Sequence, residues 1–172
     1  MKYLKKNFIG IVLFVAIDQL IKFMILQNCM EANVPLISDL IAFHPIRNTK
    51  LSWAGNFFSL SRNPIFLYTL NISAFVLVPL LYNYYWNTSV RETKVGRIFF
   101  SMILAGMICS FVDKLGGGSI DYIQIKNLFT FDLKDCYLSI WEASIFIYFV
   151  THWRTMKNFN IRDIAQYYRK KQ

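Results

Sequence analysis

Four aspartates within 23 residues are the side chains of this sequence best suited to chemistry. They are Asp113, Asp121, Asp132 and Asp135. Asp121 and Asp135 have aromatic and aliphatic neighbours, which favours a partly dry site over solvated loop charges. Two carboxylates brought together there share a proton, because ionising both would place like charges side by side in a low dielectric. We therefore predict a pair in which one carboxylate activates water to attack a peptide carbonyl, while its protonated partner polarises the carbonyl oxygen.

Other chemistries find little support in the sequence. It contains no P-loop, nucleophile elbow or HExxH motif. The three cysteines form no CxxC pair, so the sequence predicts neither a metal site nor a disulfide framework. His44 and His152 fall on opposite predicted sides of a membrane, and we expect both to be structural or solvent-facing. The predicted mechanism needs no metal and no cofactor.

The composition predicts that membrane helices hold these aspartates in place. Hydrophobic residues make up 55% and charged residues 17% of the 172-residue chain, whereas soluble domains have about 25% charged residues. A membrane crossing needs about 20 apolar residues. Four segments qualify, at residues 8–26, 65–86, 95–112 and 136–153. We predict an all-α integral membrane protein of one domain, built as a four-helix transmembrane bundle.

Charge asymmetry predicts the orientation of this bundle. Twelve of the nineteen basic residues lie at the N-terminus, between the second and third spans or at the start of the third, and in the tail 154–172, where only two acids reduce the net charge to +10. The other segments carry a net charge of −1. By the positive-inside rule both termini are cytoplasmic, and residues 27–64 and 113–135 are extracytoplasmic. The basic residues bracket apolar runs and are not interleaved with base-reading motifs, so we expect no nucleic-acid partner.

Four segments outside the spans carry secondary-structure patterns of their own. Residues 40–48 and 119–125 are rich in aromatic and β-branched residues, which favours short strands at the membrane surface. The glycines at 116–118 allow a sharp turn before Asp121. Residues 160–171 place apolar side chains on one helical face, a pattern that fits either an interfacial helix on anionic lipid or a frayed basic tail.

Ionisable residues inside the spans are functional candidates by default, because an unpaired charge in lipid is destabilising. Asp18 and Lys22 are four residues apart on one helix face, so we expect them to pair, either as part of the site or to fix the helix against its neighbours. Glu142 follows Asp135 by seven residues, which places it on the same face about 10 Å deeper, and we expect it to point into the bundle. A proton- or ion-coupled carrier that uses Asp18, Glu142 and the loop acids is an alternative function.

Four motifs, taken in order, resemble those of the lipoprotein signal peptidases (signal peptidase II). DQLIK at 18–22 resembles the DQxxK of the family's first helix, and RNTKLSWAG at 47–55 resembles its NxGxxFG stretch. VDKLGGGSIDYI at 112–123 resembles its DRxxxGxVxDF segment, and FDLKD at 131–135 resembles its FNxAD. Each match is weak alone, but four in the right order on a four-span chain are fairly specific.

The resemblance implies an intramembrane aspartic endopeptidase of the bacterial cytoplasmic (inner) membrane. Such an enzyme removes the signal peptide from diacylglyceryl-modified prolipoproteins, cutting just before the lipidated cysteine. By position the catalytic pair would be Asp121 and Asp135. Supporting or substrate-binding residues would be Asp18, Lys22, Asn48 and Asp113, with Asp132 and Glu142 as neighbours able to alter the site. Residues 36–62 would form a small extracytoplasmic β-cradle and a surface helix, and the partners would be the lipid-modified substrate and membrane lipid, with the chain itself a monomer.

Several positions depart from the family's pattern. Asp132 stands where the family has Asn, and Lys134 where it has Ala. An extra acid beside Asp135 should raise pKa values in the cluster, which Lys134 could compensate. The other departures are Cys109 and Ser110 for Gly-Asn, Lys50 for Gly, and Trp141 for Gly. A catalytically silent relative that binds lipopeptides or partner helices is therefore a second alternative.

Overall fold

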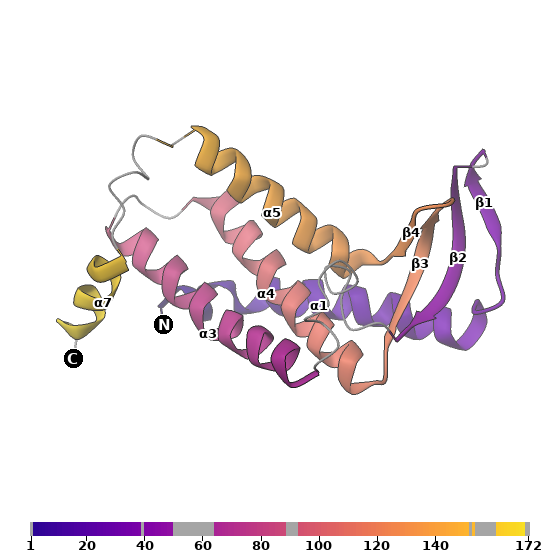
Figure 1. Ribbon diagram of the computed structural model, residues 1–172, viewed down its shortest axis with the longest axis horizontal. Coiled ribbons are helices and arrows are strands. Elements are labelled where there is room, and N and C mark those ends of the chain that lie inside the picture. Colours follow the sequence, from indigo (N-terminus) through magenta and orange to yellow (C-terminus); the bar gives the residue numbers. More distant parts are fainter. Residues whose placement is uncertain are drawn as a thin grey trace.

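Long helices and a small sheet make up the computed structural model, which describes residues 2–38, 40–49, 64–88, 93–151, 153 and 161–170 (Figure 1). The helices are α1 (Lys2–Asn28), α3 (Pro64–Thr88), α4 (Lys94–Leu115), α5 (Leu133–Thr151) and α7 (Ile161–Arg169). The strands are β1 (Val34–Ile37), β2 (Ile41–Asn48), β3 (Ser119–Ile125) and β4 (Phe129–Phe131). Residues 50–63, which include Lys50 and much of the segment 36–62 predicted to contain the surface helix, lie outside the described residues.

Helix α4 is the central helix, because it packs against α1, α3 and α5. Its buried side chains Phe100, Ile103 and Leu104 form the core together with residues of the surrounding helices. Gly106 lets α5 approach closely, since a Cβ there would lie 2.8 Å from Cδ2 of Leu138. The side chain of Tyr82 on α3 stacks on Phe100, with ring centroids 3.8 Å apart. Apolar packing along α4 therefore holds the helices that carry the acidic residues.

The outer faces of the helices are apolar, as expected for contact with lipid. Phe8 and Ile9 on α1 are 63% and 73% exposed, and Phe146 on α5 is 69% exposed. Large apolar patches of this kind mark contact with lipid or another apolar surface. Tyr3–Asn28 and Lys94–Leu115 are each long and apolar enough to cross a membrane. That α3 and α5 also cross it remains a prediction.

The sheet is antiparallel, with strand order β1-β2-β3-β4, and lies at one end of the molecule (Figure 1). The strands predicted at 40–48 and 119–125 are confirmed as β2 and β3. Their pairing sets Asn48 opposite Ser119, and Ile46 opposite Asp121. The register of these two strands therefore places Asp121 and its neighbours where the sheet meets the helices.

A glycine turn connects α4 to β3. Gly117 and Gly118 have φ values of 80° and 136°, in the region that favours glycine. A Cβ at Gly118 would also lie 2.9 Å from the backbone oxygen of Asn48. The turn can therefore bring β3 against β2 only if residue 118 lacks a side chain.

Replacing Gly118 with Ala should destabilise the fold by about 1–3 kcal/mol, because the substitution combines backbone strain with a clash against a strand. The matched control is Gly116→Ala, since Gly116 has a φ of −77° and a Cβ there would make ordinary contacts of 3.5 Å and 3.6 Å. Thermal unfolding in detergent measures both variants. Equal melting temperatures for the two would contradict this account of the turn.

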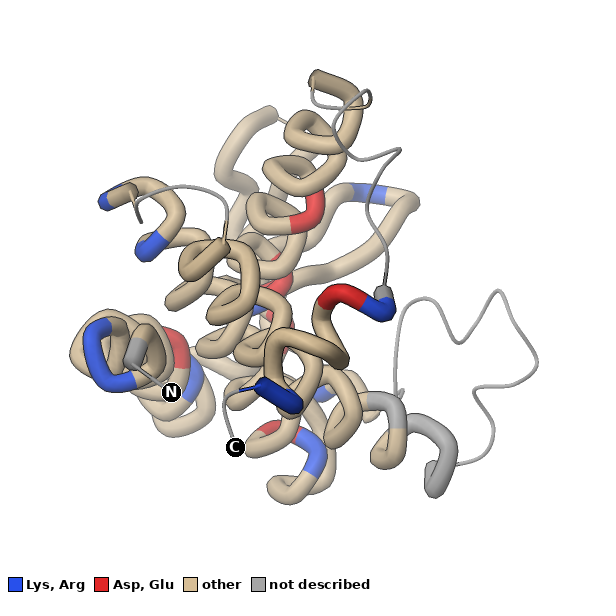
Figure 2. Tube along the Cα trace, turned by 90° about the vertical axis from the view of Figure 1, so that its left-hand side faces the viewer, with Lys and Arg blue, Asp and Glu red and all other residues tan. Residues whose placement is uncertain are grey.

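Both chain termini lie toward the end of the helices opposite the sheet (Figure 1). Helix α7 is docked there, because the hydroxyl of Tyr168 donates to the carbonyl oxygen of Leu80 on α3 at 2.8 Å. Viewed from this end, Figure 2 shows Lys and Arg near both termini. The exposed basic side chains include Lys5, Lys6, Arg162, Arg169 and Lys170. The predicted helix in the tail is thus present at 161–169, packed on α3 through its tyrosines.

Two of the acidic residues assigned to a loop from the sequence lie on helices instead. Helix α4 continues to Leu115 and so includes Asp113, while α5 begins at Leu133 and so includes Asp135. The loop prediction for these two residues was wrong because the polar last turn of α4 and first turn of α5 lie beyond the apolar runs. Those turns hold the two carboxylates on rigid elements.

Candidate active site

Five aspartates and two lysines meet where the sheet joins the helices. Asp18 and Lys22 come from α1, Asp113 from α4, Asp121 from β3, and Asp132, Lys134 and Asp135 from the start of α5. All are buried except Asp135, whose side chain is 41% exposed. Sequence reasoning named all of these aspartates and Lys22, and the structure brings them together. Their clustering from four elements defines the candidate site.

Lys22 neutralises the inner part of this cluster. Its Nζ lies 2.7 Å from a carboxylate oxygen of each of Asp18, Asp113 and Asp132. The predicted pairing of Asp18 with Lys22 is therefore confirmed, but the lysine also joins α1 to α4 and α5. Gln19 adds to the inner part, since its Nε2 donates to Asp18 at 3.1 Å and to Asp113 at 3.2 Å. Buried charges need such complete pairing, because each has lost its hydration.

The N-terminus of α5 fixes the outer acids through a reciprocal cap. Oδ1 of Asp132 accepts from the backbone N–H of Asp135 at 3.1 Å, and Oδ2 of Asp135 accepts from the backbone N–H of Asp132 at 3.3 Å. The backbone N–H of Lys134 donates to Oδ1 of Asp18 at 3.0 Å. The first amides of a helix lack internal partners and lie at its positive end, so carboxylates are stabilised there. The cap therefore fixes the position of Asp135.

Asp121 and Asp135 lie close enough to act on one molecule. One carboxylate oxygen from each of Asp121, Asp132 and Asp135 lies within 4.8 Å of the others. Oδ2 of Asp121 accepts from Nδ2 of Asn48 at 2.7 Å, while Oδ1 is buried and has no hydrogen-bond partner among the described residues. That oxygen, beside the partly exposed Asp135, can accept a hydrogen bond from a bound water.

Lys134 also lies in the candidate site, although sequence reasoning did not place it there. It is 7% exposed, and its ammonium hydrogen-bonds to Oδ2 of Asp132 and to Oγ of Ser119, the latter at 2.8 Å. Its Nζ also lies 3.8 Å from Oδ1 of Asp121 and 3.7 Å from Oδ1 of Asp135. The signal in the sequence was a lysine between two aspartates. Three close carboxylates could bind a cation, but this ammonium already contacts all three.

Asp132 and Asp135, which both precede the predicted span 136–153, differ in their affinity for protons. Burial, together with the negative charge of Asp132, raises the pKa of Asp135 to about 7. Burial also opposes ionisation of Asp132, but the charges of Lys134 and Lys22 outweigh it and hold the pKa of Asp132 below its usual value. Near neutral pH the cluster therefore combines an ionised Asp132 with an Asp135 that can hold a proton.

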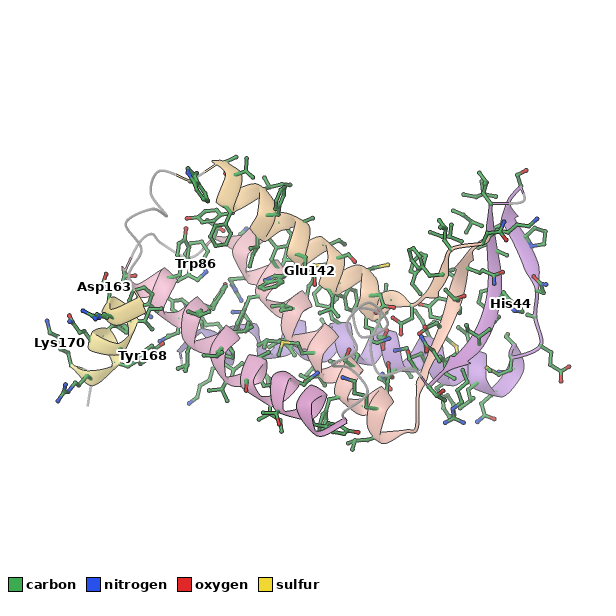
Figure 3. The ribbon with its side chains drawn as sticks, in the orientation of Figure 1. His44, Trp86, Glu142, Asp163, Tyr168 and Lys170 are labelled. Atoms are coloured by element: carbon green, nitrogen blue, oxygen red, sulfur yellow. The ribbon has the colours of Figure 1, made fainter. Side chains whose placement is uncertain are left out.

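Glu142 and His44 do not join the cluster. Glu142 is exposed on α5, so the prediction that it points into the bundle was wrong. Asp135 reaches the site from the first turn of α5. Further along the helix the same face is exposed. Trp141, next to Glu142, packs against the core instead. His44 lies on β2 in the sheet, away from Glu142 (Figure 3), and His152 is outside the described residues.

The fold is that of known bacterial membrane enzymes. Two solved structures described in those words superpose with TM-scores of 0.63 and 0.60, at 17% and 20% sequence identity. The first similarity covers 91% of this chain and 94% of the other, and the second covers 83% and 91%. At these identities the similarity establishes the fold alone.

Sequence comparison identifies the family. The model of the family described as signal peptidase (SPase) II matches residues 10–165. A lipoprotein signal peptidase of Bartonella henselae is 27% identical over 157 residues, covering 87% of this chain and 91% of the relative. One of Bartonella quintana is 27% identical over 144 residues, covering 80% and 81%. The chain belongs to the signal peptidase II family, a family of membrane proteases that process lipoproteins.

Proposed function

We propose that this chain is an aspartic endopeptidase that removes the signal peptide from diacylglyceryl-modified prolipoproteins, cutting just before the lipidated cysteine. The observation that carries the proposal is the approach of Asp121 and Asp135, whose carboxylate oxygens lie within 4.8 Å. This separation allows both carboxyls to contact a single water molecule. The membership of the signal peptidase II family supports the choice of substrate.

The surroundings of the two carboxyls support different roles for them. Asp121 is positioned by a 2.7 Å hydrogen bond that its Oδ2 accepts from Nδ2 of Asn48, and its buried Oδ1 is left to accept a proton from water, so we assign it as the base. Asp135 has the raised pKa, so it holds the proton. As water attacks the peptide carbon, its proton passes to Asp121, and the proton of Asp135 passes to the carbonyl oxygen. Asp121 then protonates the leaving nitrogen while Asp135 recovers a proton from the diol, so the C–N bond breaks and the pair returns to its starting state.

The arrangement in the membrane follows from the two ends of the molecule. The exposed basic residues near both termini suit the cytoplasmic surface by the positive-inside rule. The sheet and the acidic cluster then lie at the extracytoplasmic surface, with α1, α3, α4 and α5 as four spans. Helix α7 would lie along the cytoplasmic interface, with its basic residues toward anionic lipid. A lipid-modified substrate anchored in the same membrane would reach Asp135 by moving laterally in the membrane. The enzyme would act as a monomer.

Cleavage should fall as the pH rises through about 7, because the mechanism needs the proton of Asp135 and its pKa is about 7. The measurement is kcat/KM against pH, which reports the free enzyme. A rate that keeps rising well above neutral pH would contradict the assignment of Asp135 as the acid.

The test of the function is cleavage by the purified protein in detergent. A diacylglyceryl-modified prolipoprotein should be cut, and the same polypeptide without the lipid should be cut far more slowly. Absence of cleavage from about pH 5 to about pH 9, across the range in which such carboxyls titrate, would refute the proposed activity.

The second candidate is a catalytically silent relative that binds lipopeptides. The observation in its favour is Lys134, whose ammonium lies beside both carboxyls of the proposed pair. Lipopeptide binding by the parent protein without cleavage would favour this candidate over the protease.

A further inference from the structure

Lys134 is held in place by groups from three elements. It hydrogen-bonds to Asp132, which caps α5, and to Ser119 on β3. The backbone N–H of Lys134 is itself bound by Asp18 of α1. An ammonium has three donors, and Asp132 and Ser119 occupy two of them. The position of this cation is therefore built into the fold.

The ammonium is almost equally distant from the two carboxyls of the proposed pair. Its Nζ lies 3.8 Å from Oδ1 of Asp121 and 3.7 Å from Oδ1 of Asp135. These separations exceed an ordinary hydrogen bond of about 3 Å, so the cation acts on both carboxyls mainly through its charge. A charge this close stabilises an ionised carboxylate strongly when the site is buried. Lys134 is therefore a fixed cation placed at nearly the same distance from both carboxyls.

We infer that Lys134 is a positioning residue whose ammonium balances the single negative charge as it moves between Asp121 and Asp135 during peptide hydrolysis. The inference rests on the proposed function and deepens it. In the attack step the charge begins on Asp121 and ends on Asp135. A fixed cation equally close to both stabilises the two ends of this transfer, so the charge moves without reorganisation of the site.

Asp132 and Lys134 are the two departures from the family pattern beside Asp135, and their charges compensate each other. Asp132 adds a negative charge near the pair, and Lys134 adds the positive charge that bonds to it. Lys22 cannot replace this cation, because it is engaged with Asp18, Asp113 and Asp132 on the inner side. The ionisable groups that face Lys134 are Asp18 and Lys22 of α1, Asp113 and Lys114 of α4, Asp121 of β3, and Asp132 and Asp135 at α5, while Tyr122 and Cys136 lie near the same carboxylates.

Two substitutions should move the pH profile of cleavage in opposite directions. Lys134→Met removes a cation, so both limbs of the kcat/KM profile should move to higher pH by about one unit or more, and the optimum rate should fall about tenfold or more. Asp132→Asn removes an anion and keeps a good helix cap, so both limbs should move to lower pH. Lys126→Met, at an exposed lysine in the turn after β3, is the matched control and should leave the profile unchanged.

A merely structural role would change melting temperature and rate without moving the limbs, so unmoved limbs in Lys134→Met would overturn the inference. Shifts in the same direction for the two variants would overturn it as well. Lys134→Gln is a second neutral variant with the same expected shift, for use if the Met variant does not fold.

An infrared titration separates this inference from the proposed function. The infrared band of the protonated Asp135 carboxyl is identified by its loss in Asp135→Asn. Its intensity is then followed against pH in the parent, Lys134→Met and Asp132→Asn proteins. Its midpoint should rise in the first variant and fall in the second, even if the parent cleaves no substrate. A parent without activity would refute the proposed function, whereas unchanged midpoints would refute the role of Lys134.

Discussion

Replacing either Asp121 or Asp135 by Asn should lower cleavage of a diacylglyceryl prolipoprotein by about 10³-fold or more, because general acid–base catalysis by a positioned group contributes about 10²–10⁴-fold. Asn cannot accept the proton of water at position 121, nor donate one to the carbonyl at position 135. The double variant should be about as inactive as either single variant, since the two residues act as one unit. Initial rates under single-turnover conditions measure all three.

Asp163→Asn is the matched control, because Asp163 is exposed on α7 and lies at the other end of the molecule (Figure 3). It should keep the parent's rate. Melting temperatures near the parent's value would show that the two site variants are folded. If cleavage survived both single substitutions, the pair would be wrongly assigned, and Asp113 or Asp132 would become the candidate.

Replacing Lys22 by Met should destabilise the protein by about 3–5 kcal/mol, because breaking a buried ion pair leaves uncompensated charge. Three carboxylates, those of Asp18, Asp113 and Asp132, each lie 2.7 Å from the lost ammonium. Their mutual repulsion would separate α1 from α4 and α5, the helices that carry the site. The measurement is thermal unfolding in detergent, with an expected fall in Tm of about 10 °C.

The effect of Lys22→Met should shrink when one of the acids is removed with it. Lys22→Met combined with Asp113→Asn leaves less unpaired charge, so this double variant should be more stable than Lys22→Met alone. Lys126→Met serves again as the exposed-lysine control and should melt like the parent. A double variant as unstable as the sum of its single changes would show that Lys22 stabilises the fold through something other than these charges.

Much of the fold follows from local patterns in the sequence. Helices α1 and α4 are long apolar runs, and the pairing of Asp18 with Lys22 follows from their spacing on one helix. The strands at β2 and β3 follow from β-branched and aromatic residues, and the glycine turn from its composition. In each case the physical cause lies within a few residues of its effect.

The position of Lys134 could not be predicted in this way, because it depends on contacts between distant elements. The sequence indicated that Lys134 could offset the extra charge of Asp132. Its placement between Asp121 and Asp135, however, depends on the register of β2 with β3 and on the cap of α5. Glu142 shows a different error. Its spacing from Asp135 predicted correctly that the two residues share a helix face, but not that this face is exposed at Glu142. The buried face of α5 is the one that carries Lys134 and Tyr137.

The central claim is tested most directly by mass spectrometry of the products formed when the purified protein meets a diacylglyceryl prolipoprotein. The proposed mechanism predicts two products, a free signal peptide and a lipoprotein whose new N-terminus is the lipidated cysteine. Both should be absent with Asp121→Asn and with Asp135→Asn. An intact substrate after incubation with the folded parent, or the same two products from either variant, would contradict it.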